Sequence, residues 1–139
     1  DAYTRSVFLD GERKVLLTDT VGFIRNLPAN LVESFNSTLE EISGADFIIH
    51  VVDSCSSDIE GSIETVNREL ATLDSLRKPA VLFFNKMDAV RDLDAVRRVM
   101  AGHPGAVAGS SLHGDGIDAL KAELIRLHDE FASPERIRC

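Results

Sequence analysis

The first group of residues that could do chemistry is Asp19-Thr20-Val21-Gly22, which directly follows a mainly apolar run at residues 14–18. A carboxylate at this point can hold Mg²⁺ through a water molecule. A glycine lets a backbone N–H approach a phosphate closely, because no Cβ is in the way. The same residues also fit an ordinary turn, in which Asp19 acts as a cap and Gly22 supplies a positive φ.

A second group, Asn85-Lys86-Met87-Asp88, follows the apolar run at residues 80–84. An amide and a carboxylate three residues apart on one loop can face a single heteroaromatic edge. The carboxylate would accept from the ring N–H and the exocyclic amine of guanine, a pair of donors that adenine does not offer. Lys86 can lay its aliphatic stem along the base while its ammonium braces the loop. An Asx turn with a helix N-cap is the structural alternative.

The third group is the segment 110–116, with the sequence SSLHGDG, which follows the run at residues 106–109. Small side chains such as Ser110 and Ser111 leave backbone N–H groups free to meet a carbonyl oxygen of a base. His113 in this loop can touch a ligand or lie in solvent. Serine and glycine are common in loops of every kind, so the order of the three groups is more informative than this one alone.

Five short runs rich in β-branched and aromatic residues predict strands at residues 6–9, 14–18, 47–52, 80–84 and 106–109. The first two are separated by Asp10-Gly11, which predicts an antiparallel hairpin. Two later runs are apolar on both faces, as central parallel strands covered by helices are. Apolar residues recur at helical spacing in the segments 31–42, 59–73, 93–100 and 117–131.

These elements predict an α/β fold with a doubly wound, mostly parallel sheet and one antiparallel hairpin at its edge. In such a sheet, ligands bind outside the carboxyl ends of the strands. All three polar groups lie at such ends, and roughly a strand and a helix separate one from the next. The predicted ligand site is therefore built from strand ends that are far apart in the sequence.

The order DxxG, NKxD, SSxxGxG resembles the guanine-nucleotide-binding motifs of P-loop GTPases. Residues 16–25, with the sequence LLTDTVGFIR, and the segments at 27–28 and 38–41 are similar to the HflX branch of translation-associated GTPases. Residues 1–5 are similar to the end of that family's first switch. The resemblance covers nearly the whole chain and implies a Ras-like sheet, GTP or GDP as ligand, Mg²⁺ as cofactor and the large ribosomal subunit as partner.

The resemblance also implies roles for individual residues. Asp19 would hold Mg²⁺ through water, and Gly22 would sense the γ-phosphate at the start of the second switch, residues 23–30. Phe23 stands where many GTPases have a glutamine that orients water, which implies slow hydrolysis. Arg25 is a candidate transition-state cation or a surface residue. The implied nucleotide contacts are Asp19, Thr20, Val21, Gly22, Asn85, Lys86, Asp88, Ser110, Ser111 and Leu112.

No GxxxxGK[ST] segment occurs in the sequence, so the phosphate-binding loop and its lysine are missing. We therefore expect residues 1–132 to form a partial GTPase domain, from the end of the first switch to the last helix, without the first strand, P-loop and first helix. Residues 133–139 would be a tail. The missing strand would lie between residues 14–18 and 47–52. Their open edges would pair with each other, with a second chain, or with polypeptide outside this sequence.

Two other functions compete with a GTPase. One is an interaction module that keeps the fold but binds no nucleotide, which the missing P-loop favours. The other is a receiver-type domain with Asp19 or Asp53 as phosphate acceptor, which the loops at 85–88 and 110–116 disfavour. We interpret Asp53, at the end of its strand, as a cap for the following loop or helix.

Composition limits the remaining possibilities. The 139 residues are 44% hydrophobic and 27% charged, which suits one globular domain. The net charge of −8 argues against binding of nucleic acid by bulk charge. Cys55 and Cys139 lack metal-ligand spacing, and no apolar run is long enough to cross a bilayer. A cytoplasmic protein is expected.

Overall fold

The computed structural model describes residues 3–19, 44–72 and 78–131. The chain divides into two compact units, the first made of Asp1–Ile48 and Glu64–Lys78 and the second of Ile49–Ile63 and Pro79–Cys139. Each unit is described by itself below. None of the helices at the described residues is both long and apolar enough to cross a membrane.

The first unit contains an antiparallel hairpin of β1 (Tyr3–Phe8) and β2 (Lys14–Asp19), in which Tyr3 pairs with Asp19 and Phe8 with Lys14. Its turn is organised by Asp10, whose Oδ1 accepts the backbone N–H groups of residues 12 and 13 at 2.8 and 2.7 Å. These two bonds are the main reason that the pKa of Asp10 is lowered. The hairpin predicted from Asp10-Gly11 is confirmed.

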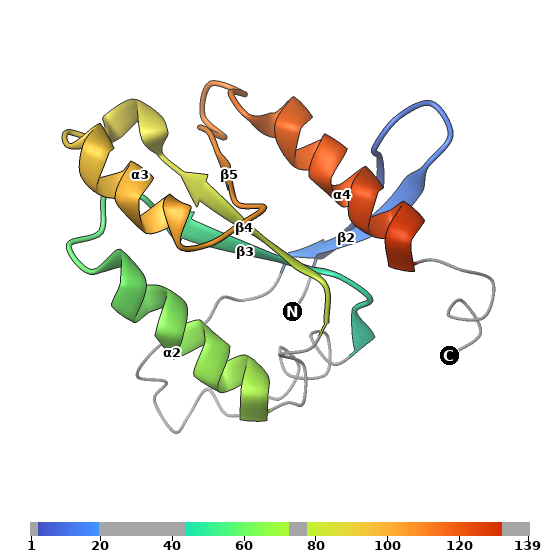
Figure 1. Cartoon of the computed structure of the whole chain (residues 1–139). Helices are drawn as coiled ribbons and strands as arrows, with labels where there is room; N and C mark the ends of the chain where they lie inside the picture. Colours follow the sequence, from blue (N-terminus) through green and yellow to red (C-terminus); the bar gives the residue numbers. More distant parts are fainter. Residues whose placement is uncertain (1–2, 20–43, 73–77, 132–139) are drawn as a thin grey trace. The chain divides into compact units, whose positions relative to one another are not determined.

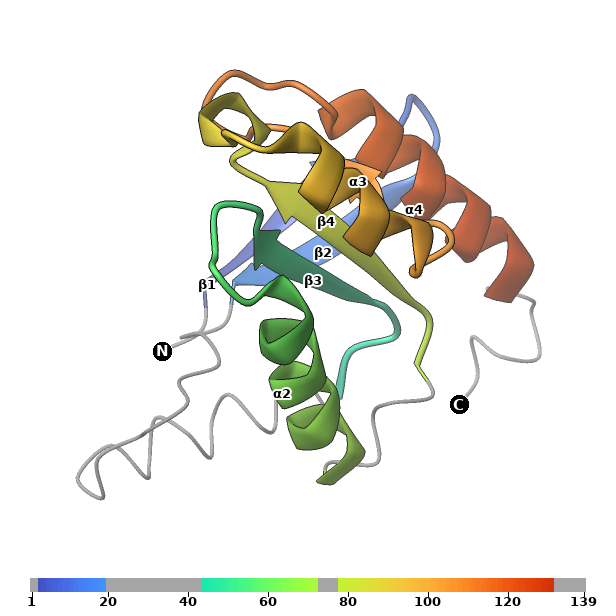
Figure 2. The same cartoon turned by 60° about the vertical axis from the view of Figure 1, so that its left-hand side comes forward.

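The second unit contains a sheet in the order β3-β4-β5, built from β3 (Ile48–Asp53), β4 (Ala80–Asn85) and β5 (Val107–Ala108). β4 and β5 pair in parallel, and Figure 2 shows that β3 and β4 run in the same direction. The second unit also contains the short 3-10 helix η2 (Met87–Ala89), α3 (Leu93–Ala101), α4 (Ile117–Phe131) and the beginning of α2 (Ile59–Thr72), which belongs to the first unit from Glu64 onward (Figure 1). The predicted α/β class, with parallel strands and one antiparallel hairpin, is confirmed.

The core of the second unit lies between its sheet and two helices. The buried members of this cluster are Val52, Ile59, Ile63, Phe84 and Val96. They come from β3, from the beginning of α2, from β4 and from α3. Burial of large apolar side chains is the main stabilising contribution to such a unit. Because β3 and β4 both contribute side chains to this cluster, its packing holds the carboxyl ends of the two strands in place.

β4 is buried on both faces, as its sequence predicts. Phe84 belongs to the cluster just described, whereas Val81 and Phe83 are equally buried but lie outside it. Successive side chains of a strand point to opposite faces, so these two face the other side of the sheet. α4 packs against β4 and buries Leu127. Helices therefore position β4 from two sides.

The predicted strand ends need small corrections. β1 begins at Tyr3 instead of residue 6. β5 is shorter than the predicted 106–109, because the N–H of Ala106 donates to the carbonyl of His103 in a turn, at 3.1 Å. The helix predicted at 31–42 lies outside the described residues.

The described strands form two separate sheets, β1-β2 and β3-β4-β5. β2 lies in the first unit and β3 ends in the second, so the three arrangements expected for their open edges stay predictions. The exposed large apolar side chains on these strands are Phe8, Leu16, Leu17 and Val51.

Candidate functional site

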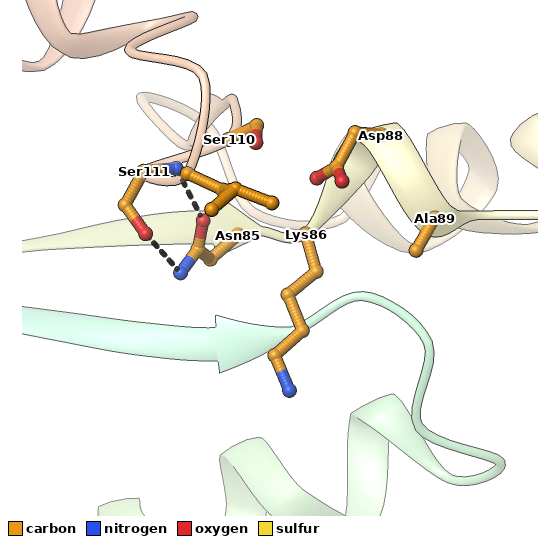
Figure 3. Close-up of a pocket in the computed structure, with 7 residues that line it drawn as sticks. Asn85, Lys86, Asp88, Ala89, Ser110 and Ser111 are labelled. Carbon is orange, nitrogen blue, oxygen red and sulfur yellow. Dashed lines mark hydrogen bonds between the residues drawn. The ribbon is translucent and has the colours of Figure 1, made fainter.

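The carboxyl ends of β4 and β5 in the second unit enclose a cavity of about 240 Å³. Its size is near the lower end of small-molecule sites, which span about 300–1,000 Å³, and it suits one heterocyclic ring system. The lining residues are Asn85, Lys86, Asp88, Ala89, Ser110, Ser111 and Leu112 (Figure 3). Six of these seven are predicted contact residues; Ala89 is the addition.

Asn85 ends β4 and joins the two loops of the pocket. Its Nδ2 donates to the Oγ of Ser111 at 3.0 Å, and its Oδ1 accepts the backbone N–H of Ser111 at 2.9 Å (Figure 3). The sequence predicts that this amide faces the edge of a ligand ring, and that contact stays a prediction. In the structure, the amide connects the end of β4 to the segment after β5, 26 residues away.

Asp88 supplies the acidic group of the pocket. It lies in η2, and its carboxylate points toward the Ser110–Ser111 segment (Figure 3). Its side chain is 28% exposed, so one side of it faces protein and the other can be reached by a ligand. Nε2 of His113 lies 3.6 Å from Oδ2. This distance permits an ion pair when the imidazole is protonated but is too long for a hydrogen bond.

Lys86 takes a direction different from that of the other lining residues. Its backbone is left-handed, with φ of 64°. Its side chain leads away from Asp88 (Figure 3), and its Nζ donates to Oδ2 of Asp53 at 3.1 Å. The sequence predicts that Asp53 is a cap, and its Oδ1 does accept the N–H of Cys55 at 2.9 Å in the following loop. The helix α2 is capped by Asp58, which accepts from the N–H of Gly61 at 3.0 Å.

The loop after β5 is held in a tight conformation by glycine. Gly116 has φ of +78°, and a Cβ there would lie 2.3 Å from the carbonyl oxygen of Ala108. Ser110 is 1% exposed, and its N–H donates to the carbonyl of Asp115 at 2.9 Å. Leu112 is 80% exposed at the rim of the cavity. The loop therefore offers a fixed backbone and an open apolar side chain to a planar ligand.

Of the residues predicted to bind phosphate and Mg²⁺, the structure describes only Asp19. Asp19 is the last residue of β2, in the first unit. Thr20, Val21, Gly22, Phe23 and Arg25 lie outside the described residues. Mg²⁺ is commonly bound by one or two carboxylates together with substrate phosphates, and Asp19 is the carboxylate that the sequence predicts for this role. The described part of the chain contains no cluster of three or more metal-ligating side chains.

A family model and the curated relatives agree on one family. The family model described as 50S ribosome-binding GTPase matches residues 1–86. The GTPase HflX of Treponema denticola is 40% identical over 127 residues, which is 89% of this chain and 32% of that protein. The GTPase HflX of Lacrimispora saccharolytica is 39% identical over 137 residues, 99% of this chain and 31% of that protein.

A solved structure gives the same result at the level of the fold. The crystal structure of SsGBP in complex with GDP is 27% identical, with a TM-score of 0.71, and the match covers 94% of this chain and 43% of that one. This chain spans about a third of the two curated relatives.

Proposed function

This chain belongs to the 50S ribosome-binding GTPase family, in its HflX-type branch, and on that premise we propose that the cavity at the ends of β4 and β5 binds the guanine base of GTP and GDP. The observation that carries the proposal is the position of Asp88. Its partly exposed carboxylate faces the Ser110–Ser111 segment across a cavity of about 240 Å³. A carboxylate accepts from both donors on one edge of guanine, and adenine has no such pair.

The Ser110–Leu112 side of the cavity also favours guanine as the ligand. The backbone after Ser110 is held by the bridge to Asp115 and by the Asn85 amide. N–H groups on such a fixed backbone can donate to the carbonyl oxygen of guanine without reorganisation. The exposed Leu112 provides an apolar contact for the face of the ring. Asn85 contributes by holding the two loops together.

We further propose that the base pocket serves GTP hydrolysis, together with the P-loop phosphate contacts that the 139 residues do not include, since GxxxxGK[ST] is missing. Asp19 would hold Mg²⁺ through water, and Mg²⁺ when bound would stabilise negative charge on the phosphate oxygens. Gly22 would contact the γ-phosphate, and Phe23 leaves water orientation to other groups. The large ribosomal subunit is the proposed partner of the whole protein.

The test is nucleotide selectivity measured on the chain itself. Amide resonances of the pocket residues are followed while GDP, xanthosine diphosphate or ADP is added at up to millimolar concentration. We expect GDP to shift the resonances of Asp88, Ser111 and Leu112, and ADP to leave them in place. Asp88→Asn should lower the response to GDP and raise that to xanthosine diphosphate, because xanthine has a carbonyl where guanine has its amine.

A matched control variant distinguishes the effect of removing the Asp88 carboxylate from the effect of removing a carboxylate elsewhere in the chain. Asp92 caps α3 by accepting from the N–H of Ala95 at 3.1 Å, and asparagine caps as well as aspartate does. Asp92→Asn should therefore retain the preference for GDP. Equal responses to GDP and ADP would refute the base assignment, and no response to any nucleotide would favour the interaction module.

A further inference from the structure

Within the second unit, the end of β3 is connected to the turn that carries the guanine pocket. The N–H of Ser54 donates to the carbonyl of Asn85 at 3.1 Å, and the Sγ of Cys55 lies 3.7 Å from the carbonyl oxygen of Lys86. The third link is the side-chain pair between Asp53 and Lys86, 33 residues apart. Three consecutive residues at the end of β3 thus contact the first two residues of the NKMD segment.

Asp53 is itself firmly placed. One carboxylate oxygen accepts the N–H of Cys55 at 2.9 Å and the other accepts from Nζ of Lys86 at 3.1 Å. The hydrogen bond from Cys55 is the largest cause that holds the pKa of Asp53 below its ordinary value, and Lys86 also lowers it. Asp53 is therefore ionised at neutral pH, with both oxygens committed to different partners.

The Lys86 ammonium needs a partner such as Asp53 because Lys86 lies close to Asp88 in the chain. Its left-handed backbone begins the turn into η2, where the N–H of Ala89 donates to its carbonyl at 3.0 Å. Asp88 follows two residues later, so the Lys86 ammonium and the Asp88 carboxylate belong to the same short turn. A long, flexible lysine side chain released from Asp53 would be attracted to that carboxylate.

We infer that Asp53 is a positioning residue of the base pocket: it holds the Lys86 ammonium away from Asp88, so that the Asp88 carboxylate stays available to the ligand. This inference rests on the proposed guanine-binding function. The Lys86 side chain in Figure 3 has the required direction, away from Asp88 and toward the β3 side of the pocket. Asp53 thus acts on the ligand only through Lys86.

The test compares Asp53→Asn with a control in the same loop. Asparagine retains an oxygen for the Cys55 N–H but removes the negative charge that attracts Lys86. Asp58→Asn removes a charge five residues later, and asparagine still caps α2. We expect Asp53→Asn to weaken GDP binding roughly two- to fivefold, the range for a partly exposed charge pair, and Asp58→Asn to leave it unchanged.

A double-mutant cycle shows whether the effect passes through the ammonium. Lys86→Met keeps an apolar stem without the charge, so Asp53→Asn should have no further effect on GDP affinity in that background. An equal loss in both backgrounds would overturn the inference, as would wild-type affinity for Asp53→Asn alone.

A second readout needs no nucleotide. In the free protein, Asp53→Asn should shift the amide resonances of residues 86–89, and Asp58→Asn should not. If wild type fails to bind GDP, the proposed function is wrong, while these shifts still decide whether Asp53 positions the turn. Unchanged resonances in Asp53→Asn would overturn the inference whatever the binding result.

Discussion

The connection between Asn85 and Ser111 gives the sharpest prediction for stability. Asn85→Ala removes two hydrogen bonds, one to the Oγ and one to the N–H of Ser111, at 3.0 and 2.9 Å. A typical hydrogen bond contributes about 0.5–1.5 kcal/mol net. Ser111 is exposed, so water replaces part of what is lost. We therefore expect a loss of about 1–2 kcal/mol in the free energy of unfolding.

Ser111→Ala provides the graded comparison, because it removes the Oγ bond and keeps the backbone N–H that donates to Asn85. Its expected loss is about half as large, and in the double variant it should add almost nothing to Asn85→Ala. Urea unfolding at 25 °C gives both values, and hydrogen exchange of residues 110–113 reports on the loop. The reasoning is refuted if Asn85→Ala is as stable as wild type, or if the two single losses simply add.

Three further predictions concern packing, backbone and pH. Phe84 is 0% exposed, so Phe84→Ala should lower the free energy of unfolding by about 3–5 kcal/mol in urea titrations; a loss below about 1 kcal/mol would contradict its place in the core. Gly114 and Gly116 both have positive φ, but only at Gly116 would a Cβ meet backbone, so Gly116→Ala should lower the melting temperature more than Gly114→Ala, and the reverse order would contradict this account. Burial is the largest cause that lowers the pKa of His50 below the ordinary histidine value of 6.5, and electrostatic repulsion from the nearby His103 lowers it further, so the unfolded chain takes up a proton at a higher pH than the folded chain does. The free energy of unfolding should therefore decrease below about pH 6.5, by at most about 1.4 kcal/mol per pH unit from this group, and urea titrations of His50→Gln should show a smaller decrease; an equal decrease would assign it to other groups.

Much of this architecture follows from local patterns in the sequence. Asp10-Gly11 between two short apolar runs predicts the hairpin, because few residues remain to reverse the chain. The run at 80–84 predicts a central strand, because a strand that is buried on both faces has no polar alternation. The polar segments at strand ends predict the location of the pocket, since parallel strands present their carboxyl ends at one edge.

Which side chains pair with each other at the pocket depends on the tertiary structure. The sequence predicts that Asn85 faces a ligand and that Asp53 is a cap, and Asp53 does accept the N–H of Cys55. The sequence does not predict that Asn85 also pairs with Ser111 or that Asp53 also pairs with Lys86. Hydropathy periods specify which face of an element is buried, but a polar side chain at a strand end has several acceptors within reach. Which one it takes depends on the spacing and direction of neighbouring strand ends. The spacing and direction of the strand ends are set by the packing of helices on β4. The two side-chain pairs join residues that are 26 and 33 positions apart, and no local sequence pattern covers such separations.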